Sequence, residues 1–282
     1  MMQNRVPEWR KDISCTQNMG WGLAWLMIAL TLFPGRSAEP CYRWGVNDPA
    51  RSGAIRSLEG LITAKGWQKG RTRAAHFVYD PVAGQSIPWP GSFTPTATAI
   101  PLELEVQPQS TASGFTLEAW VLVKQPPATD LPLIRLHLQK EDKRETIWLG
   151  LTYLPRWKQH YYGGAIGSTA VRLGHYVSHG RWRKDRVMWR HLAVTWVPAT
   201  RRMTFRMDGY LQASVPAELD GFNLTGIGLN PVPQAQYEIG MVKLSLRHLA
   251  NYELLRARNE KITGVSFRDD RPSPLPEDIG CY

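Results

Sequence analysis

The chain has 282 residues, of which 43% are hydrophobic, a fraction that is ordinary for a globular protein and not for a disordered one. Its 21 prolines and 24 glycines are typical of short strands joined by frequent turns, and its length suits one large sandwich or two small domains. The formal net charge of +10 favours acidic partners such as an acidic polysaccharide, an anionic lipid surface or nucleic acid.

Residues 1–38 are predicted to form a signal peptide. A basic start is followed by the uncharged apolar run 19–33, which is too short for a comfortable membrane span. Gly35 and Ser37 supply the small residues that a cleavage site needs. We therefore expect a mature chain from about residue 39, secreted or held in the cell envelope, without a membrane span after cleavage. The alternative is an uncleaved signal anchor.

The first half of the mature chain alternates between turns and short apolar runs. Ile55, Leu58, Leu61 and Ile62 have the spacing of a short helix. Strands are expected at 74–79, 99–106, 115–123, 133–138 and 146–153. The run 115–123 is apolar throughout, which predicts a strand that is covered on both faces.

A meander of three strands is predicted between Met188 and Ser214. Leu192, Val194 and Trp196 alternate with polar or small residues, and so do Met203, Phe205 and Met207. A period of two places each trio on one face of a strand, against a core. Asp208-Gly209 suits a two-residue hairpin turn, because both of its positions need a positive φ.

After the meander, residues 219–233 read as mostly loop and residues 241–247 as the last clear strand. Asn251 is a candidate N-cap for a helix that runs to about residue 262, since its side-chain oxygen can accept a free backbone N–H of the first turn. The tail from 269 to 276 is polar and rich in proline.

Three of these segments, taken in order, carry a resemblance. They are FTLEAWV at 115–121, WRHLAVTW at 189–196 with its hairpin ending in Asp208-Gly209, and the strand and helix at 239–262. Together they resemble the laminin-G-like members of the concanavalin A-like jelly-roll superfamily. The resemblance implies an all-β fold: a two-sheet antiparallel jelly-roll sandwich over 39–282, with a short C-terminal helix. It does not fix the function, because this fold hosts lectins, adhesion modules, hydrolases and lyases.

Two of the three cysteines, Cys41 and Cys281, remain after removal of the signal peptide, which carries Cys15. An exported protein with two cysteines is expected to form one disulfide, and the first and last strands of such jelly rolls are usually neighbours. Two free thiols are the alternative.

No motif points to catalysis or to a metal. Glu103 and Glu105 share a strand face and are most simply its solvated side, while Asp208 is explained by the turn. His175 and His179 are four residues apart in a glycine-containing stretch, where free loop histidines are the simpler interpretation. Some laminin-G-like domains hold calcium, but Val242-Lys243 stands where relatives often have Asp-Glu. We therefore expect no cofactor, with calcium supported by no motif.

The most unusual stretch is 153–190, which holds eight basic residues against one acidic residue, with aromatic residues between them. Flat rings can stack on sugars, and guanidinium groups pair with carboxylates or sulfates. The alternative is that the rings belong to the core and the cations to a solvated rim. The candidate glycan-binding residues are Arg156, Trp157, Lys158, Tyr161, Tyr162, Tyr176, Arg181, Trp182, Arg183 and Lys184.

The function expected from the sequence is non-catalytic, lectin-like binding of a polysaccharide or glycoconjugate that is anionic, with no specific nucleic-acid partner. Two alternatives stay open. One is a polysaccharide hydrolase or lyase of the same fold, for which convergent carboxylates or the neighbours His160 and Tyr161 would be the hint. The other is a protein-adhesion module, which would expose a flat apolar face.

Overall fold

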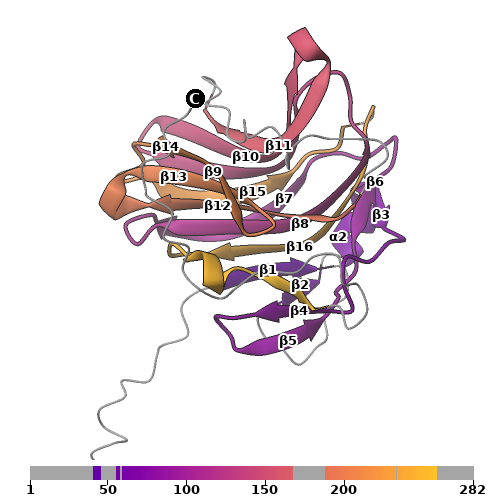
Figure 1. Ribbon diagram of the computed structural model, residues 1–282, viewed down its shortest axis with the longest axis horizontal. Coiled ribbons are helices and arrows are strands. Elements are labelled where there is room, and N and C mark those ends of the chain that lie inside the picture. The colour runs from indigo at the N-terminus through magenta and orange to yellow at the C-terminus, as the bar shows by residue number, and fades with distance from the viewer. Residues whose placement is uncertain (1–40, 46–54, 58, 168–187, 233, 259–282) are drawn as a thin grey trace, which may run out of the picture. The chain divides into compact units, whose positions relative to one another are not determined.

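The computed structural model describes residues 41–45, 55–57, 59–167, 188–232 and 234–258 (Figure 1). All of them belong to one unit, Pro40–Tyr282, and they form three β-sheets. The predicted signal peptide, Cys281 and the histidines at 175 and 179 lie outside the described residues. The disulfide therefore stays a prediction. Within the described ranges, no helix is long and apolar enough to cross a membrane.

The largest sheet, sheet A, has nine strands. They are β1 (Cys41–Gly45), β2 (Ile55–Ser57), β3 (Trp67–Lys69), β6 (Phe93–Pro95), β8 (Phe115–Gln125), β12 (Arg190–Val197), β13 (Arg202–Met207), β14 (Tyr210–Pro216) and β16 (Gln236–Ser245). The main path runs in the order β14-β13-β12-β8-β16-β1-β2, with β6 and β3 attached beside β16.

Two further sheets pack with sheet A. Sheet C runs in the order β11-β10-β9-β15-β7 and comprises β7 (Leu102–Ser110), β9 (Leu131–Lys140), β10 (Lys143–Leu154), β11 (Gln159–Ile166) and β15 (Asn223–Leu229). Sheet B runs in the order β17-β4-β5 and comprises β4 (Phe77–Asp80), β5 (Gln85–Pro88) and β17 (Arg256–Arg258). The helical pieces are α2 (Glu59–Ala64), η1 (Pro155–Trp157), η3 (Pro198–Thr200) and η4 (Asn251–Glu253).

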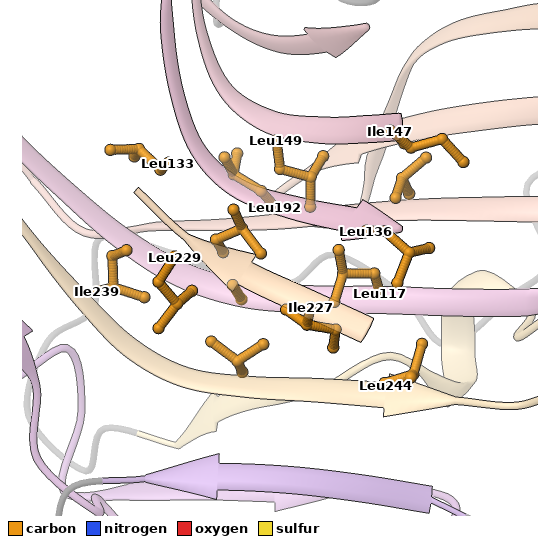
Figure 2. Packing of buried hydrophobic residues seen from close by; sticks show 14 of the residues in the cluster. Leu117, Leu133, Leu136, Ile147, Leu149, Leu192, Ile227, Leu229, Ile239 and Leu244 are labelled. Carbon is orange, nitrogen blue, oxygen red and sulfur yellow. The ribbon is translucent and has the colours of Figure 1, made fainter. Parts of the chain in front are cut away.

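The core lies between sheets A and C. Leu117, Leu192 and Leu244 of sheet A meet Leu136 and Ile227 of sheet C in one buried cluster (Figure 2). This packing of one sheet on another confirms the predicted all-β sandwich with mostly antiparallel strands.

The predicted meander is confirmed as β12, β13 and β14. Trp196 pairs with Met203, and Val194 pairs with Phe205, and all four side chains are fully buried. The turn between β13 and β14 has a positive φ at both Asp208 (52°) and Gly209 (82°), as the Asp-Gly sequence predicts.

Sheet B and the chain after β16 cover part of the outer face of sheet A. Val78 and Ile87 of sheet B pack with Trp120 and Met241 of sheet A, and Leu255 completes this second apolar cluster. This extra layer explains why β8 is buried on both faces, as predicted. It also explains why His191, Ala193 and Thr195 are buried, although they face away from the main core.

Two predictions for the second half of the chain are wrong. Residues 219–233 were expected to be mostly loop, but they contain β15, whose Leu224, Ile227 and Leu229 are buried in the core. The helix expected from Asn251 to about residue 262 is, over the described residues 251–258, a single 3-10 turn, η4, followed by β17. Leu254 and Leu255 are buried directly after that turn, so packing against sheet A ends the helix there.

Candidate functional site

The described part of the basic segment lies around the connection between β10 and β11. Arg156 and Lys158 are exposed in and directly after the 3-10 turn η1, and Lys158 has a positive φ of 49°. Tyr176, Arg181, Trp182, Arg183 and Lys184 lie outside the described residues. Trp157 is the last residue of the turn η1.

Tyr161 and Tyr162 follow on β11, and both are 5% exposed. Tyr162 packs into the main core, where burial raises the pKa of its phenol and the guanidinium of Arg190 offsets part of that rise. Tyr162 is therefore a core residue rather than a ring that stacks on a sugar, which corrects its predicted role. Tyr161 faces the other way but is equally enclosed, and its hydroxyl donates to Gln159 Oε1 at 2.9 Å. Its ring is therefore not open to a sugar either, which corrects its predicted role.

The outer face of sheet C carries a row of side chains that the sequence did not single out. Trp148 on β10 lies directly opposite Arg135 on β9, and both side chains are partly exposed. Arg135 in turn lies opposite Gly228 on β15, which lies opposite Glu103 on β7. Directly opposite residues of antiparallel strands have Cβ atoms about 5 Å apart, so the two side chains start from neighbouring positions on this face.

A histidine and a carboxylate border this row. His137 Nε2 lies 3.5 Å from Glu103 Oε2, with side-chain exposures of 34% and 61%. Both side chains lie over Gly228, because a Cβ added to that glycine would come within 3.0 Å of each. The glycine thus makes room for the pair. The exposure of Glu103 agrees with the solvated strand face that was predicted for it.

The outer face of sheet C also adjoins Gly167, which follows β11. The N–H of Gly167, the last described residue before 168–187, donates to Thr146 O at 2.8 Å. Thr146 is two residues from Trp148 on the same strand and shares its face. Gly167 therefore lies beside this row.

We define the platform as Glu103, Arg135, His137 and Trp148. A partly exposed indole offers a flat apolar surface, and the neighbouring guanidinium offers paired N–H donors. This combination suits a ring that carries a carboxylate or a sulfate. The sequence could not reveal the platform, because its members lie on three strands whose pairing is known only from the fold. Alternation along each strand is the signal that could have placed them on one face.

Outside the platform, two buried carboxylates and the turn residue Asp208 are engaged in hydrogen bonds and ion pairs. Glu118 is fully buried, with Oε2 at 3.1 Å from His191 Nε2 and 2.7 Å from the N–H of Leu255. Burial alone raises the pKa of Glu118, but Lys243 and His191 outweigh it and hold the pKa below its usual value. Glu118 is therefore an ionised, enclosed group and not a proton donor facing solvent.

Two more carboxylates are held in a similar way. Glu238 accepts from Lys124 Nζ at 2.8 Å and from the hydroxyl of Ser92 at 2.7 Å, and these bonds outweigh burial and lower its pKa. Asp208 occupies the predicted turn and also accepts from Arg190 at 2.6 Å. Among the residues that the structure describes, no three histidine, cysteine or acidic side chains gather as a metal site.

Comparison with known proteins identifies no family. No protein-family model matches the chain, and no curated protein matches it. Among solved structures, Trypanosoma rangeli sialidase in complex with the inhibitor DANA has 16% identity and a TM-score of 0.37, over 67% of this chain and 31% of the sialidase. The carbohydrate recognition domain of Emp46p has 12% identity and a TM-score of 0.39, over 69% of this chain and 94% of that domain. The CBM40 module of a Ruminococcus gnavus sialidase has 11% identity and a TM-score of 0.35, over 54% of this chain and 94% of that module. The chain thus spans less than a third of the sialidase, and at TM-scores this low the likenesses carry no argument about what it binds.

Proposed function

We propose that the protein is an exported, non-catalytic glycan-binding module that prefers acidic glycans, and that the platform on the outer face of sheet C is its binding surface. The observation that carries the proposal is the pair formed by Trp148 and Arg135, directly opposite each other and partly exposed. An indole can stack on a sugar ring while the guanidinium pairs with a carboxylate or sulfate on the same ring.

The charge of the chain supports an acidic ligand. The net charge is +10, and eight basic residues fall within 153–190, a stretch that includes β11 of sheet C. The proposed surface includes the exposed Arg156 and Lys158, while Arg181, Trp182, Arg183 and Lys184 stay candidate ligand contacts on the strength of the sequence alone. A positive surface raises the local concentration of an anionic polymer and speeds its association.

The two alternatives have less support. A hydrolase would need a carboxyl group able to donate a proton, whereas Glu118 and Glu238 are buried and their pKa values are lowered. An adhesion module would expose a flat apolar surface, whereas the platform mixes one indole with charged groups.

Binding of an immobilised uronic or sulfated polysaccharide at low and high salt tests the proposal. We expect Trp148→Ala to weaken binding about tenfold at both salt concentrations, a loss of about 1.4 kcal/mol, because stacking does not depend on net charge. Arg135→Gln should weaken binding mainly at low salt, because salt screens exposed charges over about 8 Å at physiological ionic strength.

Matched variants separate this surface from general charge and aromatic content. The double variant Arg71→Gln with Arg73→Gln removes two exposed cations from the connection between β3 of sheet A and β4 of sheet B, outside the strands of sheet C. It should bind as the unaltered protein does, whereas Arg156→Gln with Lys158→Gln should lose part of the salt-dependent affinity. If folded Trp148→Ala and Arg135→Gln proteins bind normally, the platform is not the binding surface.

A further inference from the structure

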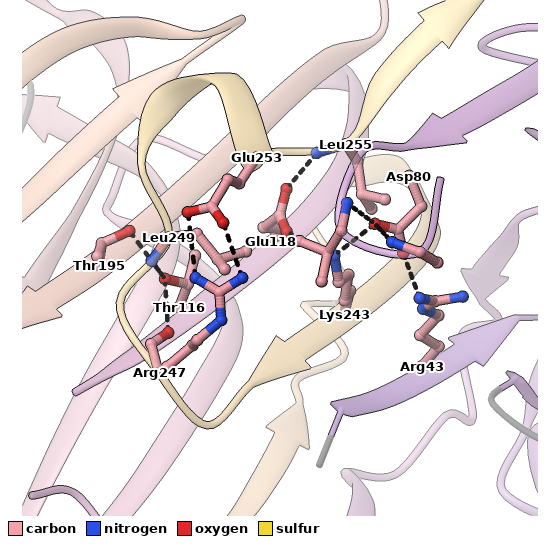
Figure 3. A network of polar contacts seen from close by, with 12 residues as sticks. Arg43, Asp80, Thr116, Glu118, Thr195, Lys243, Arg247, Leu249, Glu253 and Leu255 are labelled. Carbon is pink, nitrogen blue, oxygen red and sulfur yellow. Dashed lines mark hydrogen bonds and ion pairs between the residues drawn. The ribbon is translucent and has the colours of Figure 1, made fainter. Parts of the chain in front are cut away.

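Charged side chains are enclosed between sheet A and sheet B. Arg43 on β1, Asp80 on β4, Glu118 on β8 and Lys243 on β16 come from four strands, and each is at most 4% exposed (Figure 3). Taking charges out of water costs several kcal/mol for each ion unless partners compensate. The burial of four charged side chains is therefore costly, and apolar packing alone does not account for it.

Lys243 is the centre of the cluster. Its Nζ donates to Asp80 Oδ1 at 3.2 Å and lies 3.6 Å from Glu118 Oε1 (Figure 3). The side chains of all three residues are completely buried. An amine, a carboxyl carbon and a second carboxylate are thus held together away from water, which is the arrangement that an acyl transfer to nitrogen requires.

We propose that Lys243 and Asp80 condense to an isopeptide bond, which joins sheet A covalently to sheet B. The ammonium first gives a proton to the carboxylate, which leaves a neutral amine and a carboxylic acid. The lone pair of Nζ then attacks Cγ of Asp80, and the Nζ–Cγ bond forms. A second proton passes from Nζ to Oδ2, the Cγ–Oδ2 bond breaks, and Oδ2 leaves as water. One ammonium and one carboxylate thus become one amide and one water molecule, so atoms and charge balance without any other reactant.

The neighbours of the pair suit this reaction. Asp80 Oδ1 accepts from the backbone N–H groups of Val82 at 3.0 Å and Ala83 at 3.3 Å, donors that would stabilise the negative charge of a tetrahedral intermediate. Oδ1 is then the oxygen that remains in the amide. Arg43 forms an ion pair with Oδ2, the oxygen that leaves.

Glu118 is the residue that relays the proton. Its Oε1 lies beside Nζ and is buried without a hydrogen-bond partner, while its Oε2 is fixed by His191 and the N–H of Leu255. The lowered pKa of Glu118 keeps it ionised, and its Oε1, at 3.6 Å from Nζ and without a hydrogen-bond partner, is placed to accept the proton of the attacking nitrogen. After the reaction Arg43 and Glu118 remain as one cation and one anion, so two buried charges have been removed.

The intact mass of the expressed protein, measured after denaturation and reduction, tests the proposal. We expect a mass lower by one water than the sequence requires, together with a branched tryptic product that joins peptide 74–124 to peptide 207–247. The branched product excludes water loss by cyclisation at Asp208-Gly209 or Asp220-Gly221, which would leave the peptides separate. A full mass with separate peptides in the unaltered protein overturns the proposal, whatever any variant does.

Variants assign the roles. Lys243→Met and Asp80→Ala should each restore the full mass. Glu118→Gln, which keeps the size of the side chain, should leave most of the protein uncross-linked. A folded Glu118→Gln protein that is fully cross-linked would overturn the relay role of Glu118. A Lys243→Met protein that still lacks one water would place the lost water elsewhere and overturn the proposal.

Discussion

Trp196 and Phe205 show how single residues hold the two main sheets together. Both are fully buried, and the ring of Trp196 lies 6.1 Å from that of Phe115. Successive side chains of a strand point to opposite faces, so the alternation of apolar and polar residues places each ring in the core. The alternation alone was sufficient to predict their burial.

Truncation of Phe205 to Ala tests how much the burial of this ring stabilises the fold. We expect the free energy of unfolding to fall by about 3–5 kcal/mol, because the substitution removes a buried ring and leaves a cavity. Tyr210→Ala is the matched control, since Tyr210 is 58% exposed on the adjacent strand and its loss should cost little. Chemical denaturation of both variants gives the comparison, and equal losses would contradict the assignment of faces.

The turn between β13 and β14 shows how local sequence determines where a strand ends. The hairpin of β13 and β14 turns at Asp208 and Gly209, where both residues have a positive φ, and Asp208 accepts from the backbone N–H of His191 at 2.9 Å. The turn is therefore fixed both by backbone conformation and by a contact to the neighbouring strand.

Gly209→Ala probes that turn. A Cβ is strained at the φ of 82° that Gly209 adopts, so we expect a loss of about 1 kcal/mol in the free energy of unfolding. The strand pairing should survive, because the register of β13 and β14 is also fixed by the buried Met203, Phe205 and Met207. Chemical denaturation provides the measurement. An unchanged stability would show that the turn does not constrain residue 209.

The elements that could be predicted are those whose pattern is local. Strands β8, β12 and β13 are predicted by their apolar runs or by their alternation of apolar and polar residues. Strand β15 was not, because Gly226 and Gly228 occupy its outer face, where glycine has low strand propensity, and an irregularity between Leu224 and Gly226 breaks the alternation of its apolar residues. It exists because β9 and β7 pair with it on either side. The helix expected after Asn251 was wrong for the same reason: tertiary packing outweighed the local signal.

The candidate site was less predictable than the fold. Composition pointed to a basic aromatic segment, but Tyr162 in that segment serves the core. The platform depends on residues as far apart in the chain as Glu103 and Gly228, which only sheet pairing brings together. The buried partners of Lys243 were missed likewise, since Asp80 lies on a strand of a different sheet.

The whole molecule is a sandwich with a third layer fastened by polar contacts. Sheet B and the chain after β16 meet sheet A through few apolar side chains and several ionised ones, including Glu118 on the N–H of Leu255. In the same region Glu253 accepts from Arg247 at 2.7 Å and from the N–H of Ala250 at 2.9 Å. The attachment of this layer should therefore respond to pH more than the apolar core does.

Acid should weaken the molecule through these carboxylates. Burial raises the pKa values of Glu118, Glu238 and Glu253, but the cations and N–H groups around them outweigh it and hold all three below the ordinary 4.5. A carboxyl group whose pKa is lower in the folded state contributes its full stability above the ordinary value. It loses that contribution as the pH falls through the lower, folded-state pKa.

We therefore expect the denaturation midpoint to fall between about pH 5 and about pH 2, and to change little in response to these groups between about pH 6 and about pH 7. Glu253→Gln keeps the shape of the side chain but removes its titration. That variant should be less stable than the unaltered protein at neutral pH and should lose less on acidification, so the two stability curves converge in acid. Circular dichroism during urea denaturation at several pH values measures both curves. Parallel curves would mean that the carboxylate of Glu253 does not fasten the third layer.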